Sequence, residues 1–203
     1  MKVALIVEGF GDVQAMPTLA ARTGAILGTQ IHAHNPIRAG CVTAVAREGE
    51  LERFLKMAAS RDGLEAILVV LDLDDGCPGE MAASFIARYE AIKDEIVTPV
   101  RFCFCVREFE AWFLDNLEVL KAGAPEYDWD AEFVCADGSA KRDAKGLINS
   151  AMAKHYKEPI DQLKLTKKLE LKALYQRSKS YRKFVKSLTG MDYELLETCF
   201  AVA

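Results

Sequence analysis

The chain has 203 residues, 51% of them hydrophobic, and a formal net charge of −4 at pH 7. This length is enough to bury a sizeable core, and it suits one domain with a helical extension better than two full domains. The opening residues MKVALIVEGFGD combine one lysine with a short apolar run that meets carboxylates at once. We therefore expect no signal peptide, no membrane span and a cytoplasmic protein.

Apolar, β-rich runs alternate with helical patterns in the first half of the chain. Strands are expected at residues 3–7, 29–37, 65–73 and 98–106, and helices at 13–24, 50–60 and 79–95. This alternation is typical of βαβ units, and uniformly apolar runs such as ILVVL are typical of parallel strands covered on both faces. The sequence predicts an α/β domain over residues 1–122, with a four-stranded, mainly parallel sheet flanked by helices.

Helical periodicity takes over after the fourth strand. Residues 123–203 are expected to form a linker and a basic helical lobe packed on the domain, because 123–146 are polar and rich in turn formers. Further on, apolar residues recur at three- and four-residue steps between Leu174 and Leu188, with lysines and arginines between them. The extension is therefore predicted to be helical.

The small net charge is the sum of an acidic part and a basic part of the chain. Residues 1–138 contain 12 Lys and Arg against 23 Asp and Glu, whereas residues 139–190 contain 14 against 4. The basic segment is either a solvated helical face that docks on the acidic domain or a surface for phosphates. Under the second reading, charged donors suited to a phosphodiester backbone are Arg177, Lys179, Arg182, Lys183 and Lys186. Ser178 or Ser180 can instead cap a helix that begins there.

Carboxylates follow two of the predicted strands. Glu8 comes directly after the first, and Asp72, Asp74 and Asp75 end the third. Ligands of open α/β sheets bind outside the carboxyl ends of the strands, so these groups can share one crevice. Asp72 and Asp74 would project to the same side of an extended chain, where a hard cation such as Mg²⁺ would relieve their repulsion. The alternative is a solvated acidic loop, with Asp75 in the first turn of the next helix.

A second acidic group follows the fourth strand, in CVREFEAWFLDNL. Glu110 is a candidate third metal ligand, although glutamates in a first helical turn also interact well with the helix dipole. Trp112 is expected in the core rather than as a platform for stacked bases. The six cysteines form no CxxC pair, and His32 and His34 have no third partner, so a disulfide framework or a zinc site is not expected. A nucleotide-binding loop is not expected at GFG, which lacks a third glycine at residue 14.

Together, Glu8 and Gly9 after ALIV, and LDLDD after two intervening helices, resemble the Toprim domain of topoisomerases, primases, recombination-repair proteins and overcoming-lysogenization-defect nucleases. The resemblance implies a proton-transfer role for Glu8 and a Mg²⁺ or Mn²⁺ site at Asp72 and Asp74. Asp12 stands where the nuclease branch commonly adds an acidic residue, which implies a catalytic role for it.

The whole chain also resembles a small bacterial Toprim-like family of unknown function that is often found beside ATPases in defence loci. The shared landmarks are VEG, LxDxDD, REFEAWF and RSKSYRKF. The resemblance implies a divalent-metal-dependent nuclease or other phosphodiester-processing enzyme, with nucleic acid and a partner ATPase as partners. The alternative is a noncatalytic module that docks an ATPase or nucleic acid. The oligomeric state and the choice between DNA and RNA stay open.

Overall fold

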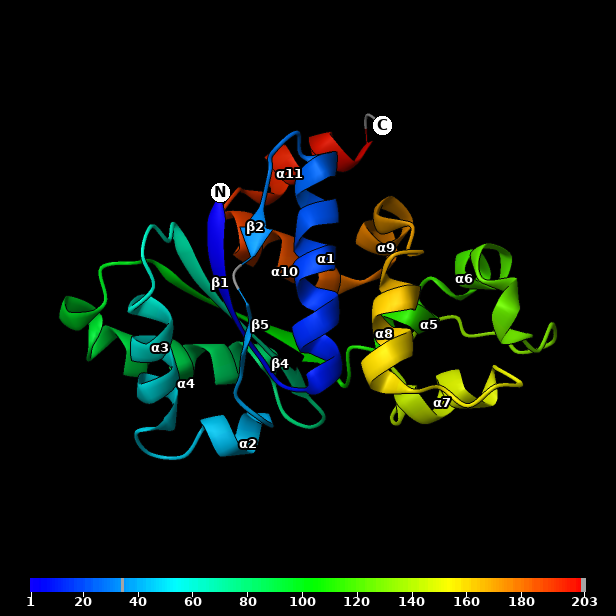
Figure 1. The fold of residues 1–203 in the computed structure, drawn as a ribbon, viewed down its shortest axis with the longest axis horizontal. Coiled ribbons are helices and arrows are strands. Elements are labelled where there is room, and N and C mark those ends of the chain that lie inside the picture. The colour runs from blue at the N-terminus through cyan, green and yellow to red at the C-terminus, as the bar shows by residue number, and fades with distance from the viewer. Residues whose placement is uncertain (34, 202–203) are drawn as a thin grey trace.

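The computed structural model describes residues 1–33 and 35–201, and it is an α/β protein. Five strands form one sheet: β1 (Lys2–Val7), β2 (His32–Ala33), β3 (Ile37–Arg38), β4 (Ala66–Leu73) and β5 (Val100–Val106). The strand order is β2-β1-β4-β5, with β3 also paired to β1, and all pairings are parallel. The predicted parallel sheet is confirmed, and the carboxyl ends of β1, β4 and β5 meet at one edge (Figure 1).

The second predicted strand is two short strands in the structure, so the sheet has five strands rather than four. β2 pairs with the start of β1, where Val3 lies opposite Ala33, and β3 pairs with its end, where Ile6 lies opposite Ile37. Pro36 lies directly before β3 and has no backbone N–H to contribute to a ladder. The pairing is therefore interrupted. His32 belongs to β2, and His34 lies outside the described residues.

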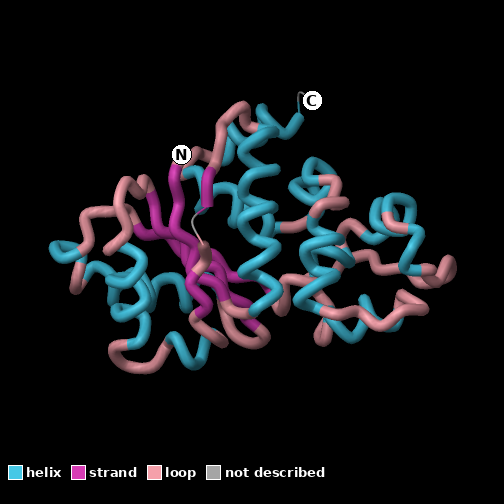
Figure 2. Tube along the Cα trace, viewed as in Figure 1, coloured by secondary structure: helices cyan, strands magenta, loops and turns pink. Residues whose placement is uncertain are grey.

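Two helical layers cover the sheet (Figure 2). The helices along the first half of the chain are α1 (Phe10–Ile26), α2 (Val42–Val45), α3 (Glu50–Ala59), α4 (Pro78–Glu90) and the 3₁₀ turn η1 (Lys93–Glu95). On one face, Leu51, Leu55 and Phe85 from α3 and α4 are buried with Phe102 and Phe104 of β5. On the other face α1 packs against β1 with α10 beside it, so the strands are covered on both sides, as their uniform apolar character indicates.

The second half of the chain is helical. Its helices are α5 (Ala111–Leu114), α6 (Leu117–Gly123), the 3₁₀ turn η2 (Pro125–Tyr127), α7 (Ala144–Ser150), α8 (Glu158–Thr166), α9 (Leu171–Arg177), α10 (Lys179–Thr189) and α11 (Tyr193–Ala201). The periodic stretch from Leu174 to Leu188 is not one helix, because Ser178 is extended and its Oγ accepts a hydrogen bond of 3.4 Å from the Tyr181 amide. Ser178 therefore caps α10, which is one of the two readings of the sequence.

The C-terminal helices share a core with the sheet. Trp112, Tyr181 and Phe184 are fully buried against one another, and Trp112 Nε1 donates a hydrogen bond of 2.8 Å to Ser180 Oγ. α8 packs along α1, where the Arg22 guanidinium donates to the carbonyls of Thr166 and Leu169 at 2.5 and 2.7 Å. Trp112 is a core residue, as expected. Within the described residues, none of the helices has the length and apolar character that a membrane crossing requires.

Candidate functional site

Glu8 and Asp72 lie side by side at the carboxyl edge of the sheet. β1 and β4 are adjacent and parallel, so the residues that end them come to the same place. The Asp72 amide donates a hydrogen bond of 3.3 Å to Glu8 Oε2. Both residues retain partial exposure to solvent, whereas the strand residues before them are buried. The structure thus brings together the two acidic groups that the sequence places after separate strands.

Asp12 is buried in the first turn of α1, close to Glu8. Its Oδ2 accepts a hydrogen bond of 2.9 Å from the Gly9 amide, which is a capping interaction, and its Oδ1 accepts one of 2.8 Å from Gln162 Nε2 on α8. Gly11 makes this second contact possible, because a Cβ there would lie 1.6 Å from Gln162 Oε1. Both oxygens of Asp12 therefore have an N–H donor.

Glu110 lies in the same region, on the segment between β5 and α5. It precedes α5, is 3% exposed, and accepts a hydrogen bond of 3.0 Å from the Tyr156 hydroxyl. Lys145, at the start of α7, lies near Glu110 and forms an ion pair with Glu158 on α8. The Lys145 amide also donates to Glu108 at 2.8 Å. Residues 145–158 therefore fold over the acidic edge of the sheet.

The pKa values of this acidic cluster, defined as Glu8, Asp12, Asp72 and Glu110, are all raised. Burial is the largest cause for each carboxyl, and it raises the pKa of Glu8 and of Glu110 to about 7. Neighbouring carboxylates add to the effect: Asp12 and Glu8 raise the pKa of Asp72, and Asp12 raises that of Glu8. Burial outweighs the amide and Gln162 donors at Asp12, whose pKa is also raised. The cluster holds protons at a pH where ordinary carboxyls are ionised.

The loop after β4 places Asp74 and Asp75 at the exposed mouth of the site. Arg107 directly follows β5 and has a backbone φ of 73°. Its guanidinium donates a hydrogen bond to the Asp74 carbonyl. Asp75 pairs with Arg107 at 3.3 Å and with Arg142 at 2.5 Å. Asp75 does not act as a first-turn anion, because α4 begins three residues later at Pro78. We call Arg107, Arg142 and Lys145 the basic rim: the two arginines pair with Asp75 in the loop after β4, and Lys145 lies near Glu110.

The donor set of the cluster suits a hard divalent cation. Carboxylate oxygens dominate, and the buried Gln162 Oε1 accepts no hydrogen bond among the described residues. In that part of the chain, no three side chains of Asp, Glu, His or Cys are arranged to enclose an ion. Mg²⁺ is commonly held by one or two carboxylates, with waters and substrate phosphate oxygens completing the shell. The residues present fit a cation held in this open way, and they do not form a closed protein cage.

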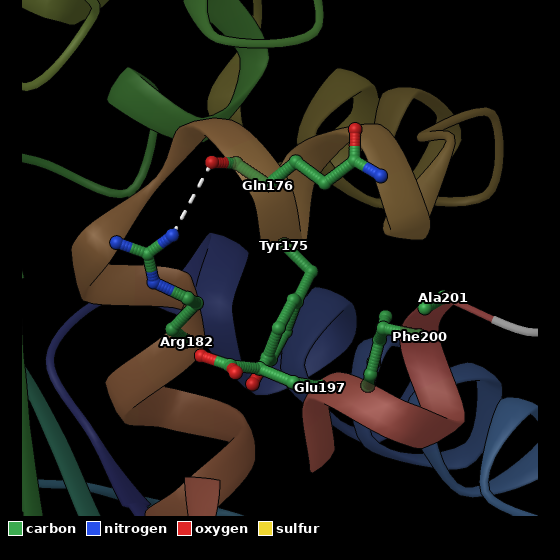
Figure 3. Close-up of a pocket in the computed structure, with 6 residues that line it drawn as sticks. All are labelled: Tyr175, Gln176, Arg182, Glu197, Phe200 and Ala201. Atoms are coloured by element: carbon green, nitrogen blue, oxygen red, sulfur yellow. Dashed lines mark hydrogen bonds between the residues drawn. The ribbon is translucent and has the colours of Figure 1, made fainter. Parts of the chain in front are cut away.

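The basic residues predicted on the extension make different contacts, although Lys179, Lys183 and Lys186 share one face of α10. Lys179 and Lys183 are exposed beside the outer edge of β5. Arg182 instead lines a separate pocket with Tyr175, Glu197 and Phe200, and donates to the Gln176 carbonyl at 3.3 Å (Figure 3). Arg177 donates to the Asp115 carbonyl at 3.2 Å, and Lys186 lies over the Tyr193 ring. The structure does not bring these five residues to the acidic cluster as a group.

No sequence pattern predicts the contribution that α7, α8 and the loop between them make to the site. Lys145, Tyr156, Glu158 and Gln162 stand in a region that reads only as linker and basic lobe. The one available signal was GFG, since an added Cβ at Gly9 would come within 3.0 Å of Glu158 Oε1 and one at Gly11 would clash with Gln162. Such glycines indicate that another part of the chain approaches their backbone closely, but they do not identify that part.

Fold and site together define an α/β protein with a parallel sheet and a cluster of buried and partly exposed carboxyls at the carboxyl edge of that sheet, bordered by basic side chains. No protein-family model, no curated protein and no solved structure matches the chain.

Proposed function

We propose that this protein is a Toprim-type, divalent-metal-dependent phosphodiester-processing enzyme, and most specifically a nuclease. The observation that carries the proposal is the convergence of Glu8, Asp12, Asp72 and Glu110 at the carboxyl edge of the sheet, inside the basic rim. Acidic residues within a rim of arginine and lysine suit a phosphodiester, whose oxygens need both cations and charged donors.

Asp72 and Asp74 would hold the cation, and Glu110 lies close enough to Asp72 to raise its pKa. A bound Mg²⁺ or Mn²⁺ would supply charge stabilisation for a phosphodiester oxygen and for the leaving oxygen. The exposure of Asp74 leaves room on its side for water and for substrate. Tyr156 donates to Glu110 and holds one of its oxygens in place.

Glu8 is suited to proton transfer. A pKa of about 7 lets one carboxyl both accept and release a proton near neutral pH, which is the condition for efficient general acid–base catalysis. Asp12 is within interaction range of Glu8 and raises its pKa. Because both oxygens of Asp12 already accept hydrogen bonds, we assign Asp12 a positioning role that acts through Glu8 and the start of α1.

The basic rim gives the substrate its contacts. Arg142 is exposed and Arg107 partly so, and both pair with Asp75, a carboxylate that a phosphate group can replace. Under this proposal, nucleic acid would lie over the carboxyl edge of the sheet. A partner ATPase and an effector role in bacterial defence belong to the proposal through the family resemblance alone.

The test is cleavage of single- and double-stranded DNA and RNA in Mg²⁺ or Mn²⁺, with and without an ATPase encoded beside the gene. The chromogenic diester bis(p-nitrophenyl) phosphate provides an assay that needs no partner. Glu8→Gln and Asp72→Asn should abolish activity, whereas Asp94→Asn, an exposed acid before β5, should not. A protein that cleaves none of these substrates under any of these conditions would be the noncatalytic binding module instead.

A further inference from the structure

The outer edge of β5 is open along part of its length. β5 ends the strand order and pairs only with β4 in the described sheet. The Ile67 amide donates to Pro99 O at 2.8 Å, and the Arg107 amide donates to Leu73 O at 3.0 Å. Peptide groups alternate in direction along a strand, so the even-numbered residues of β5 direct their N–H and C=O groups away from β4.

α10 donates a hydrogen bond only to the first part of this edge. Ser187 Oγ donates a hydrogen bond of 3.2 Å to the Phe102 carbonyl. Beyond that point, no described residue forms a hydrogen bond with the outward peptide groups of Phe104 and Val106. Val106 is partly exposed and Phe104 only 3% exposed, so these groups are open to pairing only through the groove described next. A strand edge without a partner is a template for another extended chain.

A groove runs along the open part of the edge. Pro78, Gly79 and Ala82 of α4 form one wall, α10 forms the other, and Phe104 and Val106 lie at the base. The cavity has a volume of about 320 Å³, and the residues that line it from α4 and β5 are all apolar. The wall from α4 continues into Ile86, one turn further along the helix and 47% exposed. This surface offers apolar contact next to unpaired backbone groups.

The other wall carries two positive charges. Lys179 and Lys183 stand one turn apart on α10, are exposed, and form no ion pair within the described part of the chain. Lys179 lies near enough to Asp137 to contribute to the lowered pKa of that carboxyl. The charge that complements this wall is negative, and the apolar wall opposite favours an uncharged side chain.

We propose that the open edge of β5 binds an extended segment of a partner protein, in which acidic and apolar side chains alternate. The segment would add about four residues as a further strand, since two outward residues of β5 span that length. Its acidic side chains face Lys179 and Lys183, and its apolar ones face Ala82 and Ile86. The proposal stands whether or not the acidic cluster is an enzyme site.

The test uses fluorescein-labelled synthetic hexapeptides with alternating valine and glutamate, titrated against the full chain by fluorescence anisotropy. A matched peptide with lysine in place of glutamate should bind about tenfold more weakly. In the variant K179E/K183E this preference should reverse, and in K167E/K168E, where two exposed lysines lie outside the groove, it should not change. A glutamate peptide that is N-methylated at alternate residues should lose binding, because it cannot pair with the strand.

Several results would overturn the proposal. An N-methylated peptide that binds as well as its parent would exclude strand addition, and so would a glutamate peptide that does not bind at millimolar concentration. If a fluorescein-labelled dT oligomer binds instead and K179E/K183E abolishes that binding, the groove is a nucleic-acid path. If sedimentation shows a stable dimer that excludes the peptide, a second copy of the chain covers the edge.

Discussion

Gln162 on α8 donates a hydrogen bond of 2.8 Å from Nε2 to Oδ1 of Asp12 on α1, across 150 positions of sequence. This contact joins the C-terminal extension to the acidic cluster, and it requires that residue 11 have no side chain. The extension is therefore part of the site, and disruption of this single contact should affect both stability and the properties of Glu8.

We expect Gly11→Ala to lower the free energy of unfolding by about 1–3 kcal/mol, because the new methyl group overlaps the buried Gln162 amide. Denaturant titration measures the loss. Gly79→Ala is the matched control: this glycine also lies in the first turn of a helix, and the nearest atom to an added Cβ is 3.6 Å away. The double variant G11A/Q162A should lose less stability than the sum of the two single changes, and strict additivity would show that Gln162 is not the obstacle.

The raised pKa values predict an unusual dependence of stability on pH in the absence of divalent cations. Glu8 and Glu110 have a pKa of about 7 in the folded protein against 4.5 as the ordinary value, so the folded state binds more protons than the unfolded state between these limits. The free energy of unfolding should therefore fall as pH rises from 4.5 to 7 and level off above that. Groups with lowered pKa values, such as Glu52, lose their stabilising effect only below this window.

Glu110→Gln provides the check on this pH dependence. Glu110 is 3% exposed, and its shift corresponds to on the order of 3 kcal/mol as an upper limit. The variant should show a flatter curve between pH 4.5 and 7, as measured by chemical denaturation at each pH. Glu194→Gln, an exposed acid in α11, should keep the slope of the parent protein. A parent protein whose stability rises with pH across this window would contradict the assignment of buried, protonated carboxyls.

Mg²⁺ should stabilise the folded protein at neutral pH, because it replaces protons in the acidic cluster and binds only the native arrangement. The gain should be about 1.4 kcal/mol at a concentration ten times the dissociation constant. Thermal melting with and without the cation measures this gain in Asp72→Asn and Asp74→Ala, where it should be absent, and in Asp94→Asn, where it should remain. Equal gains in all three variants would mean that the cation binds elsewhere.

Nucleic-acid binding should depend on the basic rim more than on α10. Each phosphate contact contributes a slope of about 0.7–0.9 log unit in affinity per log unit of salt. Removal of the Arg142 and Lys145 side chains should therefore flatten the salt dependence by about two contacts. The fourfold alanine variant of Lys179, Arg182, Lys183 and Lys186 should leave the slope near that of the parent protein. The opposite pattern would show that α10, the surface predicted from sequence charge, makes the phosphate contacts.

The sequence by itself determines the three long parallel strands, β1, β4 and β5, and the position of Glu8 and Asp72 at their carboxyl edge, but not the division of the second predicted strand into β2 and β3. Runs such as ILVVL are stable only when they are buried on both faces, and parallel neighbours bring the ends of β1 and β4 to one edge. The sequence of each strand and the residues directly after it are therefore enough to predict that Glu8 and Asp72 are adjacent. The sequence also indicates Ser178 as a candidate helix cap, because a serine side chain can accept a hydrogen bond from the amide three residues later, as it does here from Tyr181.

Only the tertiary structure decided what surrounds these carboxyls. Tyr156 and Gln162 reach Glu110 and Asp12 because α8 packs along α1, and packing between distant segments leaves no local pattern in either one. The same applies to Asp75, which pairs with Arg142 rather than with the start of a helix. The raised pKa values follow from this packing, since burial is their largest cause and burial is a property of the assembled fold.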